Sequence, residues 1–193
     1  MKKVLYFASF LLCMGFMASC EKDDIENTAT VKMAGQWYVQ IDGVDEDGEV
    51  IPGYEDYFGT GRVLLLTYNT AGNNPDEMFI DDLGAFDVAT FYDYDAYPSY
   101  SFKSKVEINQ KDLTFSTENA ENLADANKFE SDLYPVTIKG GKILKNAGHQ
   151  NNGSVADSIV FYISYDGDPW YPDDGYAMYR VSGIRYSGLV END

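Results

Sequence analysis

Histidine, cysteine and basic residues are all scarce in this chain of 193 residues. It contains one histidine, two cysteines, and 14 lysines and arginines against 32 aspartates and glutamates, which gives a formal net charge of −18. So acidic a surface repels polyanions, and nucleic acid is therefore not expected as a partner. Both cysteines, Cys13 and Cys20, lie near the N-terminus, so the rest of the chain has no thiol for a disulfide, a nucleophile or a metal. Stability must come from a packed core.

The few candidates for catalysis do not form a recognisable site. The one histidine, His149, lies in a polar stretch from Asn146 to Ser154 that is typical of a surface loop, and no Gly-x-Ser-x-Gly motif occurs. The 32 acids offer too many pairs for a glycosidase assignment. Two acid-rich stretches, Asp42 to Glu49 and Asp166 to Gly175, lack the spacing of a twelve-residue calcium loop and favour hairpin turns. No metal and no cofactor is predicted, and the catalytic residues stay unknown.

The N-terminal segment is typical of an exported protein. Two lysines precede an uncharged apolar run, Val4 to Ala18, that is shorter than the ~20 residues a bilayer requires. The sequence Met17-Ala18-Ser19-Cys20 resembles the lipobox of bacterial lipoproteins. That resemblance implies that residues 1–19 are a signal peptide and that Cys20 carries the acyl chains of a membrane anchor. An ordinary secretory signal is the alternative.

The residues after Cys20 bear on localisation and domain organisation. The block Glu21-Lys22-Asp23-Asp24 resembles the acidic export tag of Bacteroidetes lipoproteins, which implies an outer-membrane lipoprotein exposed on the cell surface, with the periplasmic face as the alternative. Residues 20–33 are interpreted as a lipidated tether, and residues 34–193 are long enough for one domain with its own core.

Apolar and polar residues alternate with period two through most of this domain, as in strands that are buried on one face. Strands are expected near residues 35–41, 62–68, 85–94, 99–109, 112–117, 133–139, 142–147, 157–165 and 176–186. The pair Gly140-Gly141 is predicted to be a two-residue hairpin turn, and only Glu118 to Phe129 has a weakly helical pattern. The predicted class is all-β, an antiparallel barrel of about eight strands with little helix.

Residues at the two ends of this domain resemble the lipocalin and calycin arrangement. Gly35-Gln36-Trp37 stands on the first predicted strand, and Arg180 and Arg185 stand on the last. In that arrangement an arginine of the final strand covers the tryptophan and closes one end of the barrel. Alternation puts Arg180 and Arg185 on opposite faces of the strand, and the sequence does not decide which of the two closes the barrel.

A closer resemblance covers the lipobox, the tether, the stretch Ala34 to Val39 and the ending Ser182 to Gly188. Together these are similar to the Bacteroidetes lipoproteins called lipid-binding putative hydrolases. The resemblance implies a lipocalin-like barrel that binds a small apolar or amphipathic ligand, a lipid by preference, in a cavity of the barrel, and it supplies no catalytic motif. A glycan-binding accessory lipoprotein, a hydrolase of lipid or ester substrates, and a part in a surface protein complex are the alternatives.

Ligand contacts are expected among aromatic residues that neighbour Asp, Pro or Gly, because such neighbours mark strand ends and loops near a barrel mouth. The remaining aromatics are expected to pack the core. The candidates are Tyr92, Tyr94, Tyr97, Trp170 and Tyr171.

Overall fold

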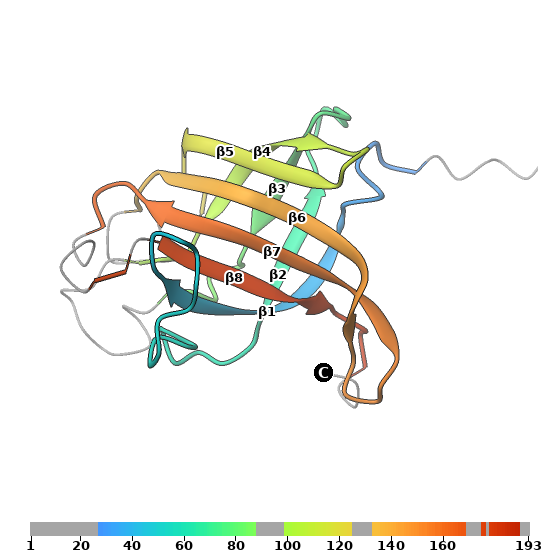
Figure 1. Ribbon diagram of the computed structural model, residues 1–193. Coiled ribbons are helices and arrows are strands. Elements are labelled where there is room, and N and C mark those ends of the chain that lie inside the picture. The colour runs from blue at the N-terminus through green and yellow to red at the C-terminus, as the bar shows by residue number, and fades with distance from the viewer. Residues whose placement is uncertain (1–26, 88–98, 125–132, 169–174, 177, 190–193) are drawn as a thin grey trace, which may run out of the picture.

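The chain forms a closed barrel of eight antiparallel strands, each paired with its neighbours in sequence order (Figure 1). The computed structural model describes residues 27–87, 99–124, 133–168, 175–176 and 178–189. The strands are β1 (Gly35–Val44), β2 (Val63–Asn69), β3 (Glu77–Asp81), β4 (Lys103–Asn109), β5 (Thr114–Ala120), β6 (Val136–His149), β7 (Val155–Tyr165) and β8 (Met178–Arg185). The last strand pairs with the first, which closes the barrel. The predicted all-β barrel of about eight strands is confirmed.

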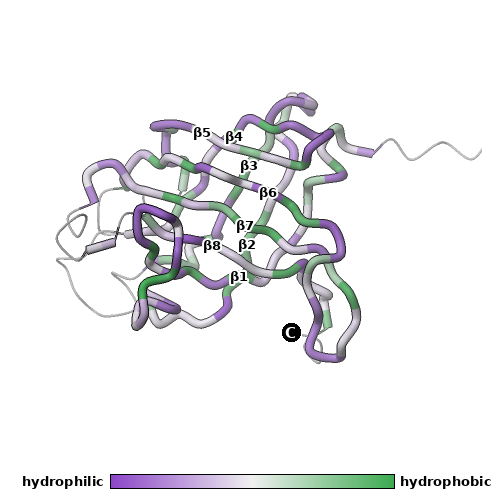
Figure 2. The backbone as a smooth tube through the Cα atoms, in the orientation of Figure 1, coloured by the Kyte–Doolittle hydropathy of each residue, from purple (hydrophilic) through white to green (hydrophobic). Residues whose placement is uncertain are grey.

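Alternation along the strands places every second side chain inside the barrel. Trp37, Val39 and Ile41 of β1 are fully buried, and apolar and polar residues are mixed along each strand (Figure 2). Each of the eight strands contributes buried apolar side chains to one continuous core. Its largest members include Trp37, Tyr100, Tyr179, Phe86, Phe102 and Phe161. In the part of the chain that the structure describes, the core therefore fills the barrel with large side chains, many of them aromatic.

The expected hairpin at Gly140-Gly141 is wrong, because both glycines lie within the single long strand β6. Between Lys139 and Lys142 the pairing with β7 shifts register, so that the two glycines lie opposite one residue, Phe161. This is a bulge, and Gly140 supplies the positive φ of 61°. A Cβ on Gly141 would overlap the ring and carbonyl oxygen of Phe115. Hairpin turns and bulges both require positive φ, which is why the sequence suggested the wrong one.

Two other expectations also fail. No strand covers the described residues 85–87 of the strand predicted at 85–94, and the third strand is β3 instead. Asp82 bends the chain there, since its carboxylate accepts a bond from the Phe86 N–H at 2.8 Å and Phe86 is fully buried. The helix expected from Glu118 is wrong over its first residues, which continue β5 as far as Ala120. Among the described residues there is also no helix long and apolar enough to cross a bilayer.

The barrel has two different ends. We call the one where β1 begins the Trp37 end; its described segments are 27–34, 70–76, 110–113, 150–154 and 186–189. We call the other the loop end; its described segments are 45–62, 82–87, 99–102, 121–124, 133–135, 166–168 and 175–176. The N-terminal segment lies across the Trp37 end, where Met33 is buried against the core and the Ala29 N–H donates to Asn73 at 2.8 Å.

Candidate functional site

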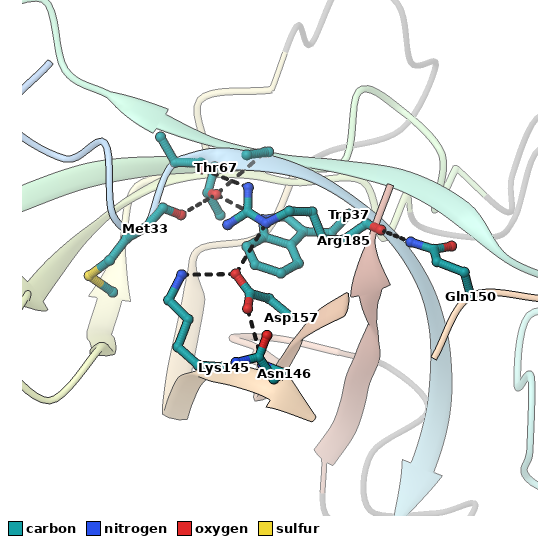
Figure 3. A network of polar contacts seen from close by, with 10 residues as sticks. Met33, Trp37, Thr67, Lys145, Asn146, Gln150, Asp157 and Arg185 are labelled. Carbon is teal, nitrogen blue, oxygen red and sulfur yellow. Dashed lines mark hydrogen bonds and ion pairs between the residues drawn. The ribbon is translucent and has the colours of Figure 1, made fainter. Parts of the chain in front are cut away.

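At the Trp37 end, a stacked arginine covers a buried tryptophan (Figure 3). The indole Nε1 of Trp37 donates to the Thr67 hydroxyl at 2.9 Å, and that hydroxyl donates to the Met33 carbonyl at 2.7 Å. The guanidinium carbon of Arg185 lies 4.4 Å from the centre of the Trp37 ring, and its Nη1 donates to the Ala34 carbonyl at 3.1 Å. The buried indole N–H is therefore satisfied, and a cation shields the ring face from water.

Gly35 is required at this end because a Cβ there would overlap the guanidinium of Arg185. The Gly-x-Trp spacing thus leaves room for the arginine, and register places Arg185 directly opposite Trp37. Arg180 lies instead on the outer wall, where its Nη2 is 3.0 Å from the Asp42 carboxylate. Of the two arginines left open by the sequence, Arg185 is the one over Trp37.

A shared carboxylate joins Arg185 to the strand beside it. Asp157 accepts a bond from Lys145 at 2.8 Å and from the Asn146 N–H at 3.1 Å, and Arg185 Nε lies 3.4 Å away. Although burial raises the pKa of the Asp157 carboxyl, these donors and charges outweigh it and hold the pKa below the ordinary value. Around Trp37, Arg185 and Asp157 the side chains are thus packed and paired, which fits a structural role.

The loop end contains the most unusual polar arrangement, a carboxylate surrounded by tyrosines inside the barrel. Asp168 accepts bonds from Tyr100 at 2.7 Å and Tyr176 at 3.0 Å. The Tyr179 hydroxyl lies 2.6 Å from the Tyr176 oxygen and 3.1 Å from the Asp168 carboxylate. Because a hydroxyl has one proton, the shorter contact makes Tyr179 a donor to Tyr176, which donates onward to Asp168. We call these four residues the Asp168 network.

Burial fixes the protonation of the network's hydroxyls. It raises the pKa of Tyr100, Tyr176 and Tyr179 far above the ordinary value, and the nearby Asp168 charge raises each of them further. These tyrosines therefore keep their protons throughout the physiological range and act as donors. The network offers neutral hydroxyls and one carboxylate within an otherwise aromatic end of the core.

Two half-buried tyrosines lie against this network. The rings of Tyr54 and Tyr57 stack with centres 5.4 Å apart, and Tyr57 also contacts the rings of Tyr176 and Tyr179 at 5.3 and 5.4 Å. Both belong to the 45–62 segment, which folds back on β1 through a bond from the Tyr57 N–H to the Ile41 carbonyl at 2.9 Å. The loop end thus combines a partly exposed aromatic surface with buried polar groups directly behind it.

A second buried carboxylate, Asp82, shapes the neighbouring part of the loop end. It accepts bonds from the backbone N–H groups of Gly84, Phe86 and Phe102 and from the Ser101 hydroxyl, at 2.7 to 3.1 Å. Burial raises its pKa to about 6, and the four donors work against a larger rise. Asp82 therefore holds the segment after β3 against the segment before β4.

Several predicted site residues lie outside the described residues. They are Cys20, Tyr92, Tyr94, Tyr97, Trp170 and Tyr171. Of the other candidates, His149 is exposed at the Trp37 end, where β6 pairs it with Val155. In the stretch from Asp42 to Glu49, Asp45 accepts bonds from the N–H groups of Asp47 and Glu49, which is turn chemistry. Within the described ranges, no group of three or more His, Cys, Asp or Glu side chains could hold a metal ion.

The loop-end residues described above were missed as candidates. The stretch GYEDYFG, residues 53–59, contains aromatics next to Gly and Asp, the same pattern that selected the other tyrosines, so Tyr54 and Tyr57 could have been found. No local pattern indicates that Asp168 joins Tyr100 and Tyr179, because the bond from Tyr100 to Asp168 spans 68 residues.

Comparison with known proteins identifies a family. A family model described as lipid-binding putative hydrolase matches residues 22–190. No curated protein matches the chain.

Proposed function

We propose that this chain, which belongs to the family described as lipid-binding putative hydrolases, is a cell-envelope lipoprotein that binds a small apolar or amphipathic molecule at the loop end of its barrel. A lipid is the preferred ligand. The observation that carries the proposal is the pairing of the stacked Tyr54 and Tyr57 rings with the buried Asp168 network behind them.

The chemistry of the loop end suits an amphipathic molecule. The stacked rings offer apolar area, and covering each 100 Å² of such surface contributes roughly 2.5 kcal/mol. The three tyrosine protons are donated within the network, so its oxygens can only accept hydrogen bonds, which suits a headgroup that carries hydroxyl donors. Deeper inside the barrel, the described core side chains already pack against one another, so the ligand is assigned to the loop end.

Membrane attachment through Cys20 is part of the same proposal. It rests on the resemblance of Met17-Ala18-Ser19-Cys20 to a lipobox, after an apolar run that is too short to span a bilayer. Two or more acyl chains on Cys20 would hold the protein at a membrane durably. By the export tag at residues 21–24, that membrane would be the outer membrane, with the barrel on the cell surface.

Calorimetric titration of residues 21–193 with a monoacylglycerol below its micelle concentration tests the ligand proposal. We expect saturable 1:1 binding with a negative heat-capacity change, because apolar surface is buried. Tyr57→Ala should weaken the affinity by about tenfold or more, which corresponds to about 1.4 kcal/mol.

The matched control is Tyr186→Ala, because Tyr186 is also a half-buried tyrosine that contacts a second ring, Tyr38, but lies at the Trp37 end. It should bind as the unsubstituted protein does. Circular dichroism establishes that both variants are folded. Equal losses in the two variants, or no loss with Tyr57→Ala, would contradict a site at the loop end.

A further inference from the structure

The position of the N-terminal segment bears on how an anchored barrel would be oriented. From residue 28 onward this segment is fixed to the Trp37 end. The Val31 N–H donates to the Thr28 carbonyl at 3.1 Å, the Ala29 N–H donates to Asn73 of the β2–β3 turn at 2.8 Å, and Met33 and Thr30 are fully buried. Only eight residue-to-residue steps, from Cys20 to Thr28, separate the proposed lipid from the fixed part of the chain.

That separation is short compared with the barrel. Eight residues reach about 28 Å when fully extended, and a flexible chain of that length typically spans about 16 Å. The ten residues of β1, which runs from the Trp37 end to the loop end, at ~3.3 Å each and a strand tilt of ~40°, give a barrel height of about 25 Å. The loops at the loop end add to this height. With those loops included, an inverted barrel would need the tether at about full extension, well beyond the ~16 Å that a flexible chain of this length typically spans, so the Trp37 end is favoured next to the bilayer that holds Cys20.

The formal charges of the two ends favour the same orientation, with the Trp37 end next to the membrane. The described loop-end segments contain eleven carboxylates and one arginine, Arg62, a formal charge of −10. The described segments of the Trp37 end contain two lysines, Lys32 and Lys111, and two aspartates, and are therefore neutral. An anionic membrane surface repels the loop end and leaves the Trp37 end unaffected.

We propose that the loop end faces away from the anchoring membrane, so that the ligand is exchanged with the aqueous side and not with the leaflet that holds Cys20. This inference rests on the proposed function, both for the anchor and for ligand binding at the loop end. The protein would then take up amphiphiles that arrive through water, and its Trp37 end would lie next to the headgroups.

Energy transfer from single labelled cysteines to a headgroup dye tests the orientation. The lipidated chain is placed in phosphatidylcholine vesicles that carry the acceptor dye. Glu46→Cys labels an exposed loop-end position and Lys111→Cys an exposed Trp37-end position, and no contact of either side chain is disturbed. Cys20 is consumed by lipid and Cys13 leaves with the signal peptide, so each variant has one thiol.

The expected result is transfer several-fold stronger from position 111 than from position 46. Inserting about 20 Gly and Ser residues between positions 26 and 27 should reduce this difference, because the longer tether lets the barrel turn over. Equal transfer from the two labels on the short tether, or stronger transfer from position 46, overturns the inference. A chain that does not associate with vesicles also overturns it, by removing the anchor. The calorimetric titration on residues 21–193 needs no anchor, so it reports separately on the ligand proposal.

Discussion

Replacing Arg185 with alanine should destabilise the barrel far more than an ordinary surface substitution. The side chain is about one-third exposed, so its stacking on Trp37 contributes about 1 kcal/mol. Its bond to the Ala34 carbonyl contributes about 1.5 kcal/mol, since the donor is charged. The ion pair with Asp157 adds little, because Lys145 still neutralises that carboxylate. Together these contacts predict a loss of about 2–3 kcal/mol in the free energy of unfolding.

Urea unfolding followed by far-ultraviolet circular dichroism measures this loss, which at typical slopes lowers the midpoint by about 1 M or more. Lys145→Ala is the matched control. It removes a cation from the same Asp157 carboxylate, 2.8 Å away, but Lys145 contacts neither Trp37 nor Ala34, so its cost should stay below about 1 kcal/mol. If Arg185→Ala costs no more than Lys145→Ala, the stacked arginine does not close the barrel and the reasoning fails.

Three further outcomes are expected. Gly141→Ala should lower the free energy of unfolding, measured by thermal unfolding, by about 1–3 kcal/mol, because the added Cβ overlaps Phe115. Gly72→Ala is the control and should cost little, because its added Cβ has one neighbouring atom, at 4.0 Å. Tyr179→Phe should lower the free energy of unfolding by about 1–2 kcal/mol, because it removes the donor to the buried Tyr176 oxygen. Tyr38→Phe, on the outer wall, is the control. If Tyr179→Phe costs no more than Tyr38→Phe, the hydrogen-bond assignment is wrong. For Asp82, the folded pKa of about 6 exceeds the ordinary 3.8, so the folded state holds its proton more tightly. The stability difference between the unsubstituted protein and Asp82→Asn should therefore fall by about 2 kcal/mol as pH rises from 4 to 6, and a difference independent of pH would refute this pKa.

The parts of the fold that follow from local alternation were predictable. Trp37, Val39 and Ile41 alternate with polar residues, and this pattern by itself implies a strand with one buried face. Alternation also predicted that Arg180 and Arg185 lie on opposite faces. It could not say which of them faces Trp37, because that depends on the register between β1 and β8, which no local pattern specifies.

The parts that depend on pairing between distant strands were not predictable. Gly140-Gly141 fits a hairpin or a bulge equally well in sequence, and the positions of Phe115 and Phe161 on the neighbouring strands decide for the bulge. The Asp168 network likewise joins residues from three separate segments of the chain. Its members are ordinary in sequence, and their shared burial appears only when the barrel closes.

The most direct test of the central claim is native mass spectrometry of residues 21–193 purified without detergent, followed by extraction and identification of any bound molecule. We expect one amphipathic molecule per chain, or a 1:1 adduct after incubation with monoacylglycerols or phospholipids, that is lost with Tyr57→Ala and retained with Tyr186→Ala. A mass that stays that of the bare chain after incubation with fatty acids, monoacylglycerols and phospholipids would contradict the claim. Binding of oligosaccharides in the same measurement would then favour the glycan-binding alternative.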